Sequence, residues 1–374
     1  MTTALFNSFA LKSLELENRI AMAPMTRGMS PNGIPSRDVA AYYRARAEGG
    51  TGLIITEGTT INRLAASNNA NIPNFHASEA TAGWSRVVNE VHEAGGKIAS
   101  QLWHQGASRQ PGTGPNPNEP SEGPSAIEGT ARAMNDNDIA DTIEAFVAAA
   151  GAAKEIGFDA VELHGAHGYL IDQYLWAQTN RRTDRYGGDI KDRARFGADI
   201  IRGVRARVGA DFPIIMRFSQ FKLKDYAARL AETPDELEAL LAPYVDAGVD
   251  ILHASTRRFW EPEFEGSPLN LAGWAKRITG LPVITVGSVG LKGADVGDML
   301  KGDASRPQVD ELDQLEERMA RGEFDIVAVG RALLTDPEWA NKIRDGRTSE
   351  LKGFDRAALS SLVGAEHPSP ALAV

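Results

Sequence analysis

Two histidines and a tyrosine stand close together in one short stretch of the chain. His164, His167 and Tyr169 lie in the run HGAHGY, where glycines flank the turn between them. Two imidazoles three residues apart at a strand end can direct both rings at one point, and a nearby phenol can supply a proton. This pattern favours a paired hydrogen-bond donor for an oxygen that gains negative charge, with Tyr169 as the proton source.

Two other interpretations of the histidines remain open. They could bind a metal ion, but such a site needs three or four ligands. The sequence has no cysteine and no obvious third carboxylate beside the pair. They could also be core residues whose ring nitrogens bond to the backbone. We expect the oxygen-binding pair and no metal site.

A phosphate site is indicated by glycines that follow two runs predicted to be strands. Gly287 follows Pro282–Val286, and Gly330 follows Asp325–Val329. Bare backbone N–H groups at such positions can approach an oxyanion, and Arg331 supplies a countercharge. The glycines could instead serve only to turn the chain. No GxGxxG run follows a strand, so a Rossmann nucleotide site is not supported.

Arg217 lies near the end of a further predicted strand, Pro213–Phe218. A permanent cation is costly at that position unless it faces a ligand anion or a carboxylate. The sequence therefore leaves two alternatives, an anionic group on a ligand and a structural ion pair.

Eight short β-branched runs, each followed by a loop and a helical stretch, must position these residues. Eight parallel strands alternating with helices predict a single α/β domain over residues 1–374, a (β/α)8 TIM barrel with its active site at the C-terminal ends of the strands. The predicted strands are Arg19–Ala23, Gly52–Thr56, Lys97–Leu102, Ala160–His164, Pro213–Phe218, Asp250–Ala254, Pro282–Val286 and Asp325–Val329.

Four segments outside the strands have their own patterns. Apolar residues near a 3.6-residue period predict a helix over Asp138–Glu155 with an Asp as its N-cap. The opening run LFNSFALKSLELENR predicts a short N-terminal hairpin that plugs the barrel. Residues Gln110–Gly129 hold too many Pro and Gly for a helix, which predicts a long loop after strand three and a lid candidate. The long connection over residues 291–323 has no assigned role.

The amino-acid composition limits the kinds of partner and cofactor that this protein can bind. The 40 Lys and Arg against 50 Asp and Glu make a formal charge of −10, which repels nucleic acids and anionic membranes and favours a small-molecule substrate. The absence of cysteine excludes disulfides, thiolate nucleophiles and iron–sulfur clusters. No basic leader and no apolar run of 18 residues is present, so we expect a soluble cytoplasmic protein, either a monomer or a homo-oligomer.

Together these motifs resemble the old yellow enzyme family of flavin-dependent ene-reductases. The resemblance runs from Leu5 to about Glu338 and rests on ENRIAMAPMTR, QLWHQG, GFDAVELHGAHGYLIDQYLWAQTNRRTDRYGG and VAVGRALLTDP. It implies non-covalent FMN, NADPH or NADH as the hydride donor, and reduction of C=C bonds conjugated to a carbonyl or nitro group. Relatives that carry an iron–sulfur cluster need a cysteine motif, which this sequence lacks.

The resemblance also implies a role for each motif residue. Tyr169 would be the proton donor, His164 and His167 would bind the activating oxygen of the substrate, and Trp103 would wall its pocket. The C-terminal aromatic that many relatives place beside the flavin could only be Phe354. The implied flavin contacts are Pro24, Thr26 near O4, the backbone of Gly58, Gln101 at the pyrimidine edge, Arg217 at the N1/O2 side, and Gly287, Gly330 and Arg331 at the phosphate.

Three rival functions remain open. Another FMN barrel, such as a 2-hydroxy-acid oxidase or a dihydroorotate dehydrogenase, uses a His or a Cys/Ser base and does not need a tyrosine two residues past the histidine pair. Outside flavin chemistry, a phosphosugar-binding barrel could act as an isomerase or a lyase. A flavin-binding protein without catalysis is the third alternative, which the complete set of donors disfavours.

Overall fold

The eight expected strands form one closed parallel barrel. The computed structural model describes residues 4–292, 306–307 and 310–365. The order around the barrel is β10-β11-β14-β3-β4-β5-β8-β9, which confirms the predicted (β/α)8 fold. The barrel strands are β3 (Ile20–Met22), β4 (Leu53–Thr60), β5 (Lys97–Trp103), β8 (Ala160–His167), β9 (Ile214–Lys222), β10 (Ile251–Ser255), β11 (Val283–Val286) and β14 (Ile326–Val329).

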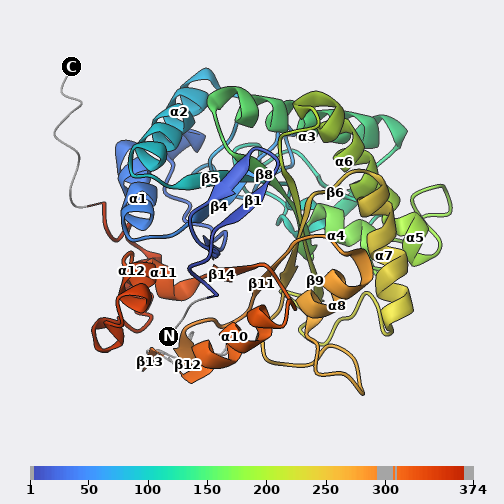
Figure 1. Ribbon diagram of the computed structural model, residues 1–374. Coiled ribbons are helices and arrows are strands. Elements are labelled where there is room, and N and C mark those ends of the chain that lie inside the picture. The colour runs from blue at the N-terminus through green and yellow to red at the C-terminus, as the bar shows by residue number, and fades with distance from the viewer. Residues whose placement is uncertain (1–3, 293–305, 308–309, 366–374) are drawn as a thin grey trace.

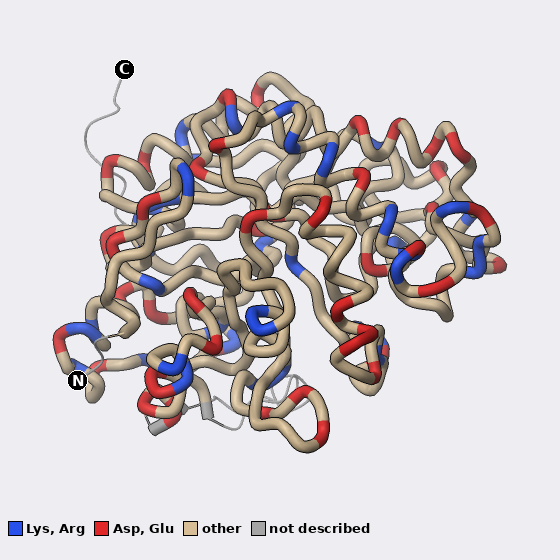
Figure 2. Tube along the Cα trace, turned by 45° about the vertical axis from the view of Figure 1, so that its right-hand side comes forward, with Lys and Arg blue, Asp and Glu red and all other residues tan. Residues whose placement is uncertain are grey.

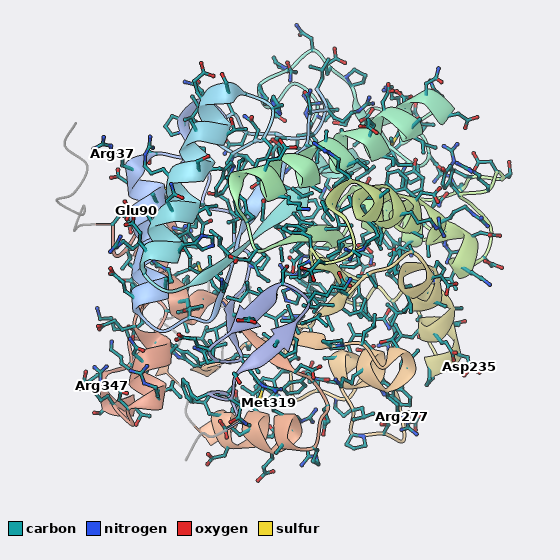
Figure 3. All side chains as sticks on the ribbon, turned by 45° about the horizontal axis from the view of Figure 1, so that its top comes forward. Arg37, Glu90, Asp235, Arg277, Met319 and Arg347 are labelled. Carbon is teal, nitrogen blue, oxygen red and sulfur yellow. The ribbon has the colours of Figure 1, made fainter. Side chains whose placement is uncertain are left out.

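Helices surround the barrel (Figure 1), and the main hydrophobic core lies between them and the strands. Labelled side chains such as Arg37 and Asp235 lie at the periphery in Figure 3. None of the described helices is long and apolar enough to cross a membrane. The helices are α1 (Arg37–Glu48), α2 (Ser78–Glu93), α3 (Asp136–Ile156), α4 (Leu170–Leu175), α5 (Ile190–Arg193), α6 (Arg195–Val208), α7 (Pro234–Asp246), α8 (Leu271–Thr279), α10 (Asp310–Ala320), α11 (Arg331–Thr335) and α12 (Trp339–Arg344).

The α3 helix confirms the expected helix but corrects its cap. The side chain of Asn135, not of an aspartate, accepts the backbone N–H of Asp138, and the Asp138 carboxylate accepts the N–H of Asn135. This reciprocal pair satisfies two N–H groups that the first turn of a helix leaves without partners. The helix therefore begins at Asp136, two residues before the predicted start.

Several barrel strands run further than their sequence patterns indicated. The β4 strand continues to Thr60, and β8 continues to His167. Each contains a register shift, between Ile55 and Gly58 in β4 and between Gly165 and His167 in β8. Gly58 and His167, which follow the predicted strands Gly52–Thr56 and Ala160–His164, therefore belong to the strands themselves. Local bulges keep these strands paired while they turn the side chains at the barrel mouth.

A short hairpin closes the N-terminal end of the barrel. β1 (Phe9–Leu11) pairs antiparallel with β2 (Leu14–Leu16), which confirms the predicted hairpin. Its buried side chains Phe9, Leu14 and Leu16 form one apolar cluster with residues that point into the barrel. In Figure 1 the blue hairpin lies over the middle of the ring of strands. The barrel-facing members of the cluster are Ala21, Ala23, Leu53, Ile55, Ala99, Ala160, Ile215, Ile251, Ile284, Ile326 and Ala328.

The long excursion after β5 is organised by one buried arginine. Arg109 is fully buried, and its guanidinium donates to the backbone carbonyls of Ser67, Thr113, Asn116 and Glu119. As predicted, residues 110–129 form no helix. They contain only the short β6 (Ser121–Gly123), which pairs in parallel with β7 (Ala131–Ala133). The role of this segment as a lid stays a prediction.

The connection over residues 291–323 falls partly outside the described residues. Its described parts are an antiparallel pair formed by β12 (Leu291–Lys292) and β13 (Arg306–Pro307), and helix α10. Helix α10 contacts the start of the chain, because its Glu316 carboxylate accepts the backbone N–H groups of Ala4 and Leu5.

The hairpin plug generates a stability prediction. Leu14 is fully buried, so Leu14→Ala should lower the free energy of unfolding by ~2–5 kcal/mol, because it removes apolar contacts and leaves a cavity. The exposed neighbour Glu15 provides the control, since Glu15→Ala should change stability by less than ~0.5 kcal/mol. Urea unfolding measures both. Equal unfolding midpoints for Leu14→Ala and the parent chain would show that the hairpin does not seal the barrel.

Candidate active site

The interior of the barrel turns from apolar to polar toward the C-terminal ends of the strands. Cross-strand pairing sets Gln101 beside Glu162 and places Arg217 between His164 and His253. These residues come from four neighbouring strands, β5, β8, β9 and β10, and the parallel register of the strands brings their side chains together. The polar side chains of this layer, none more than 7% exposed, are Gln101, Glu162, His164, Arg217, His253 and Ser255.

His164, His167 and Tyr169 meet at the mouth of the barrel, as predicted from their spacing. The two imidazole rings lie 5.3 Å apart between centroids and almost perpendicular, at 89°. The ring of Tyr169 lies 4.9 Å from that of His164 and 5.0 Å from that of Trp103. Trp103 is nearly buried, so it packs against the edge of the tyrosine and fixes the direction of the phenol.

Backbone strain and a buried ion pair hold the turn between His167 and Tyr169. His167 has a φ of +66°, a conformation that side chains other than glycine seldom adopt. The next N–H, of Gly168, donates to the Asp172 carboxylate at 2.5 Å, and Lys222 donates to the same carboxylate at 2.8 Å. Asp172 and Lys222 are both buried, so the pair stabilises the turn from within the protein.

Burial sets the protonation states of these groups. It is the main cause that holds the pKa of His164 and of His167 well below the usual value, and the nearby Arg217 cation lowers both further. Both imidazoles are therefore neutral near pH 7, and each carries one N–H. Burial also raises the pKa of Tyr169, against the opposing effect of Arg217, so its phenol keeps its proton.

Ser255 and Arg217 connect this trio to the barrel interior. The Ser255 hydroxyl lies 2.8 Å from Nε2 of His167 and accepts a 3.3 Å hydrogen bond from Arg217. Among the described residues, Nε of Arg217 and Nδ1 of His164 are buried without a hydrogen-bond partner. Buried polar groups are rarely left unpaired, so a ligand is the natural partner for these atoms.

Glu162 and His253 are functional candidates that sequence reasoning missed. The Glu162 carboxylate accepts a 2.8 Å hydrogen bond from the Gln101 amide and lies 2.5 Å from Nδ1 of His253. A carboxylate only accepts, so the NH2 group of Gln101 must face it, and this contact determines which way the amide points. The available signal was an acidic residue between two apolar ones, Val161 and Leu163, inside the predicted strand Ala160–His164.

The predicted phosphate residues line one cavity of about 220 Å³, here called the first cavity. Arg331 donates to the Ser288 hydroxyl at 3.2 Å, and Ser288 has a φ of +51°. A Cβ on Gly330 would make only ordinary van der Waals contacts, the nearest with the sulfur of Met25 at 3.7 Å, and Gly330 itself lines the cavity. The bare backbone of Gly330 therefore borders the cavity. The lining also includes Pro24, Met25, His167, Arg217, Leu223, Tyr226, Ser255, Arg257 and Gly287.

The structure gives the surroundings of four further residues that the sequence singled out, two of which are glycines. A Cβ on Gly58 would lie 2.8 Å from the Trp103 ring, and one on Gly287 would lie 2.6 Å from Thr256, so packing alone requires both glycines. Thr26 lies at the same rim as Pro24 but is exposed and does not line the first cavity. Phe354 is buried in the main core.

Comparison with known proteins identifies this arrangement. A family described as "NADH:flavin oxidoreductase / NADH oxidase family" matches residues 4–305. The chain belongs to this family. The match confirms the resemblance drawn from the sequence motifs.

Individual relatives support the same assignment. An NADH oxidase of Thermoanaerobacter brockii is 36% identical over 93% of this chain and 52% of the relative. An NADPH dehydrogenase of Clostridium acetobutylicum is 31% identical over 89% and 92% of the two chains. A structure of morphinone reductase in complex with tetrahydroNAD superposes with a TM-score of 0.80 at 29% identity, over 98% and 97% of the two chains. The chain spans about half the length of the first relative.

The residues present fit the flavin that this family is named for. The first cavity combines the bare backbone at Gly330, the Arg331 cation and the buried Arg217 guanidinium, whose Nε has no partner among the described residues. Gln101 offers an oriented amide in the same layer. A metal ion has no comparable place, because no group of three or more His, Asp or Glu side chains suited to metal lies in the part of the chain that the structure describes.

The loop that carries Pro24 and Thr26 depends on the buried carboxyl of Glu57. This group accepts the backbone N–H groups of Arg27 and Gly28, both at 2.8 Å. Burial nevertheless raises its pKa to about 7, against these two hydrogen bonds and the Arg27 cation. The folded chain therefore binds this proton more tightly than the unfolded chain, and the stability that the proton confers is lost as pH rises through about 7.

Glu57→Gln should remove this pH dependence. The amide keeps an acceptor for the two N–H groups but cannot ionise, so the variant should gain stability relative to the parent as pH rises from 5 to 8, by ~1–3 kcal/mol. Urea unfolding at each pH measures the free energy of unfolding of the variant and of the parent. Groups that titrate alike in both proteins cancel in the difference between the two values. A difference that stays constant with pH would show that Glu57 does not titrate in this range.

Glu162→Gln should weaken cofactor binding. The substituted amide can donate as well as accept, so Gln101 loses its fixed orientation, and the dissociation constant of FMN for the apoprotein should rise about three- to tenfold. Fluorescence titration of FMN measures this constant. Glu122→Gln is the matched control, because Glu122 is equally buried but pairs with Arg63 and Arg132 outside the barrel. Unchanged FMN affinity in Glu162→Gln would contradict the orienting role.

Proposed function

We propose that this chain reduces C=C bonds conjugated to a carbonyl or nitro group, with non-covalent FMN as its cofactor and NADPH or NADH as its hydride donor. The observation that carries the proposal is the convergence of two neutral histidines and one protonated tyrosine beside Arg217. An activated alkene needs a donor for its oxygen and a proton for its carbon, and these groups can provide both.

FMN would be held by the residues that the family resemblance implies, five of which line the first cavity, namely Pro24, Arg217, Gly287, Gly330 and Arg331. Gly287, Gly330 and Arg331 would hold its phosphate, and Gln101 and Arg217 would contact its ring, together with Pro24, Thr26 and Gly58. When bound, this cofactor supplies the hydride chemistry, from the nicotinamide to the β-carbon of the substrate. Because one site serves both reactants, they would bind in turn.

His164 and His167 would each donate an N–H to the oxygen of the substrate. Because burial and the Arg217 cation hold the pKa of both rings well below the usual value, the neutral rings bring no charge of their own, and their hydrogen bonds strengthen as negative charge builds on that oxygen. An interaction that grows toward the transition state raises turnover rather than substrate affinity alone. His167 would exchange its present Ser255 contact for the substrate.

Tyr169 would protonate the α-carbon. A phenol whose pKa lies above its usual value is an effective acid only toward a strongly basic centre, and the enolate-like carbon formed by hydride transfer is one. The ring of Trp103 against its edge would keep the phenol directed at that carbon.

The rival functions lack a comparable fit. A 2-hydroxy-acid oxidase needs a base that takes up a proton, whereas burial and Arg217 favour the unprotonated form of both histidines and leave the imidazolium product costly. A phosphosugar isomerase or lyase would use the Arg331 side of the cavity and leave Gln101 and Trp103 without a role. We propose neither.

We also propose that its partners are small molecules. The formal charge of −10 disfavours nucleic acid and anionic membranes, and Figure 2 shows acidic and basic positions interspersed over the surface. A cytoplasmic location and either a monomer or a homo-oligomer agree with this proposal.

Tyr169→Phe tests the assigned acid. The variant keeps the ring but loses the proton, so flavin reduction by NAD(P)H should stay nearly unchanged while reoxidation by cyclohexenone falls about 100-fold or more. Stopped-flow absorbance measures the two half-reactions separately. Reoxidation by a quinone, which needs no carbon protonation, should survive.

Tyr174→Phe is the matched control for this experiment. Its phenol lies in the same segment but contacts the sulfur of Met134 at 3.5 Å in the core. Both half-reactions should be normal in this variant. Cyclohexenone reduction at the parent rate in Tyr169→Phe would assign the proton to another donor.

A further inference from the structure

A segment near the C-terminal end of the described chain contacts the loop that follows β3. Residues 356–363, here called the C-terminal clasp, begin with a single 3₁₀ turn at Arg356–Leu359. In Figure 1 this segment, at the red end of the colour range, runs beside α1. None of its residues lines the first cavity. Any influence of the clasp on the cofactor site must therefore pass through another residue.

Arg27 connects the clasp to the loop after β3. Its side chain is 7% exposed, and its Nη2 donates to the backbone carbonyls of Ala358 at 2.6 Å, Ser361 at 2.8 Å and Leu359 at 3.4 Å. Two of these carbonyls belong to the end of the 3₁₀ turn, where a helix leaves its last C=O groups without partners inside the helix. One nitrogen of a buried cation therefore holds three carbonyls of the clasp.

A second buried arginine fixes the clasp to the wall of the barrel. Arg46 in α1 is fully buried, and it donates to the carbonyl of Val363 at 2.5 Å and to that of Leu333 in α11 at 2.9 Å. Its guanidinium lies 3.6 Å from the ring centroid of the buried Tyr42, and that of Arg27 lies 5.5 Å from the same centroid. The clasp is thus tied to two helices and can support Arg27.

The loop after β3 needs this support because little else holds it. Pro24 and Met25 line the first cavity. The backbone of Met25 and Thr26, however, forms no hydrogen bond within the part of the chain that the structure describes. The loop is restrained at its two ends, by the pairing of β3 and by the N–H of Arg27, which donates to Glu57 at 2.8 Å. The side chain of Arg27 adds the restraint from the clasp.

We propose that Arg27 is a positioning residue for the cofactor site and that the C-terminal clasp is its support. Through Arg27, the clasp limits the conformations of the loop that carries Pro24 and Thr26. A loop that is already ordered loses less conformational entropy when a ligand binds, so the clasp strengthens FMN binding. This inference rests on the proposed flavin site, and it adds to that site a segment that forms no part of its wall.

The full-length parent chain provides the first test, because coupling between two sites is reciprocal. Bound FMN should in turn stabilise the clasp, so the amides of residues 356–363 should exchange hydrogen severalfold more slowly with FMN than without it. Hydrogen exchange read by mass spectrometry measures this. FMN also stabilises the fold as a whole, so helix α3, outside the barrel, is the reference segment. A clasp that FMN slows no more than α3 would overturn the proposal.

Arg27→Met provides the second test, because it removes the charge and keeps a side chain of similar length. The dissociation constant of FMN for the apoprotein should rise about tenfold, within the usual range for coupling between two sites. FMN should also no longer slow hydrogen exchange in the clasp more than in α3. Fluorescence titration of FMN measures the constant. Parent-like affinity in this variant would contradict the positioning role.

Arg27→Lys is the conservative variant that should restore binding. Because Nη2 alone makes the three contacts with the clasp, an ammonium with its three N–H groups can replace it. The dissociation constant of FMN should return to within about threefold of the parent value. A constant as high as in Arg27→Met would show that the carbonyl contacts do not matter and would overturn the proposal. This variant and the exchange measurement on the parent decide the matter if Arg27→Met does not fold.

Arg205→Met is the matched control for lost stability. Arg205 in α6 also donates to backbone carbonyls, those of Gly209 at 2.6 Å, Phe212 at 2.7 Å and Gly248 at 3.1 Å. These carbonyls precede β9 and β10, at the N-terminal end of the barrel. The variant should unfold at a lower urea concentration than the parent and keep its FMN affinity within about twofold. An equal loss of FMN affinity in Arg205→Met and Arg27→Met would assign the effect to stability and overturn the positioning role.

The outcomes separate this proposal from the function on which it rests. FMN binding by the parent chain with the same affinity in Arg27→Met would overturn only the positioning role. No binding of FMN by the parent chain would remove the proposed function and the positioning role together.

Discussion

One buried cation shapes the candidate site. Arg217 lies inside the barrel, where its guanidinium donates a 3.3 Å hydrogen bond to the Ser255 hydroxyl and its Nε has no hydrogen-bond partner among the described residues, and a charge in such surroundings must be compensated. Glu162 supplies a negative charge in the same layer. The cation in turn lowers the pKa of His164 and His167, which keeps both rings neutral. It therefore favours negative charge on a ligand and disfavours positive charge on its neighbours.

The rest of the barrel makes that burial possible. Apolar side chains of the hairpin and of the first inward-facing positions fill the N-terminal end, and they separate the polar layer from that end of the barrel. The register of β5, β8, β9 and β10 then sets the polar residues side by side. The apolar hairpin contributes to function because it makes the N-terminal end of the barrel apolar. In the described interior, the polar side chains therefore gather at the barrel mouth.

Backbone geometry at the mouth divides the site into two parts. His167 and Ser288 both have a positive φ. His167 lines the first cavity and also the neighbouring cavity beside Tyr169, and Ser288 lies next to the proposed phosphate residues. Such strain persists only where surrounding contacts enforce it. The Asp172–Lys222 pair does so for His167, and the Arg331 contact restrains Ser288.

The sequence by itself determined the eight strands, the plugging hairpin, the family and the trio His164, His167 and Tyr169. Each of these rests on local patterns, namely periodicity, turn residues and short motifs. Only the tertiary structure decided that Glu162 orients Gln101, that Ser255 bonds to His167, and that a second cavity adjoins the first. The two hydrogen bonds join residues 61 and 88 positions apart, and the cavity is lined by segments that follow four different strands. Cross-strand register and local bulges bring these residues together, and neither leaves a local pattern in the sequence.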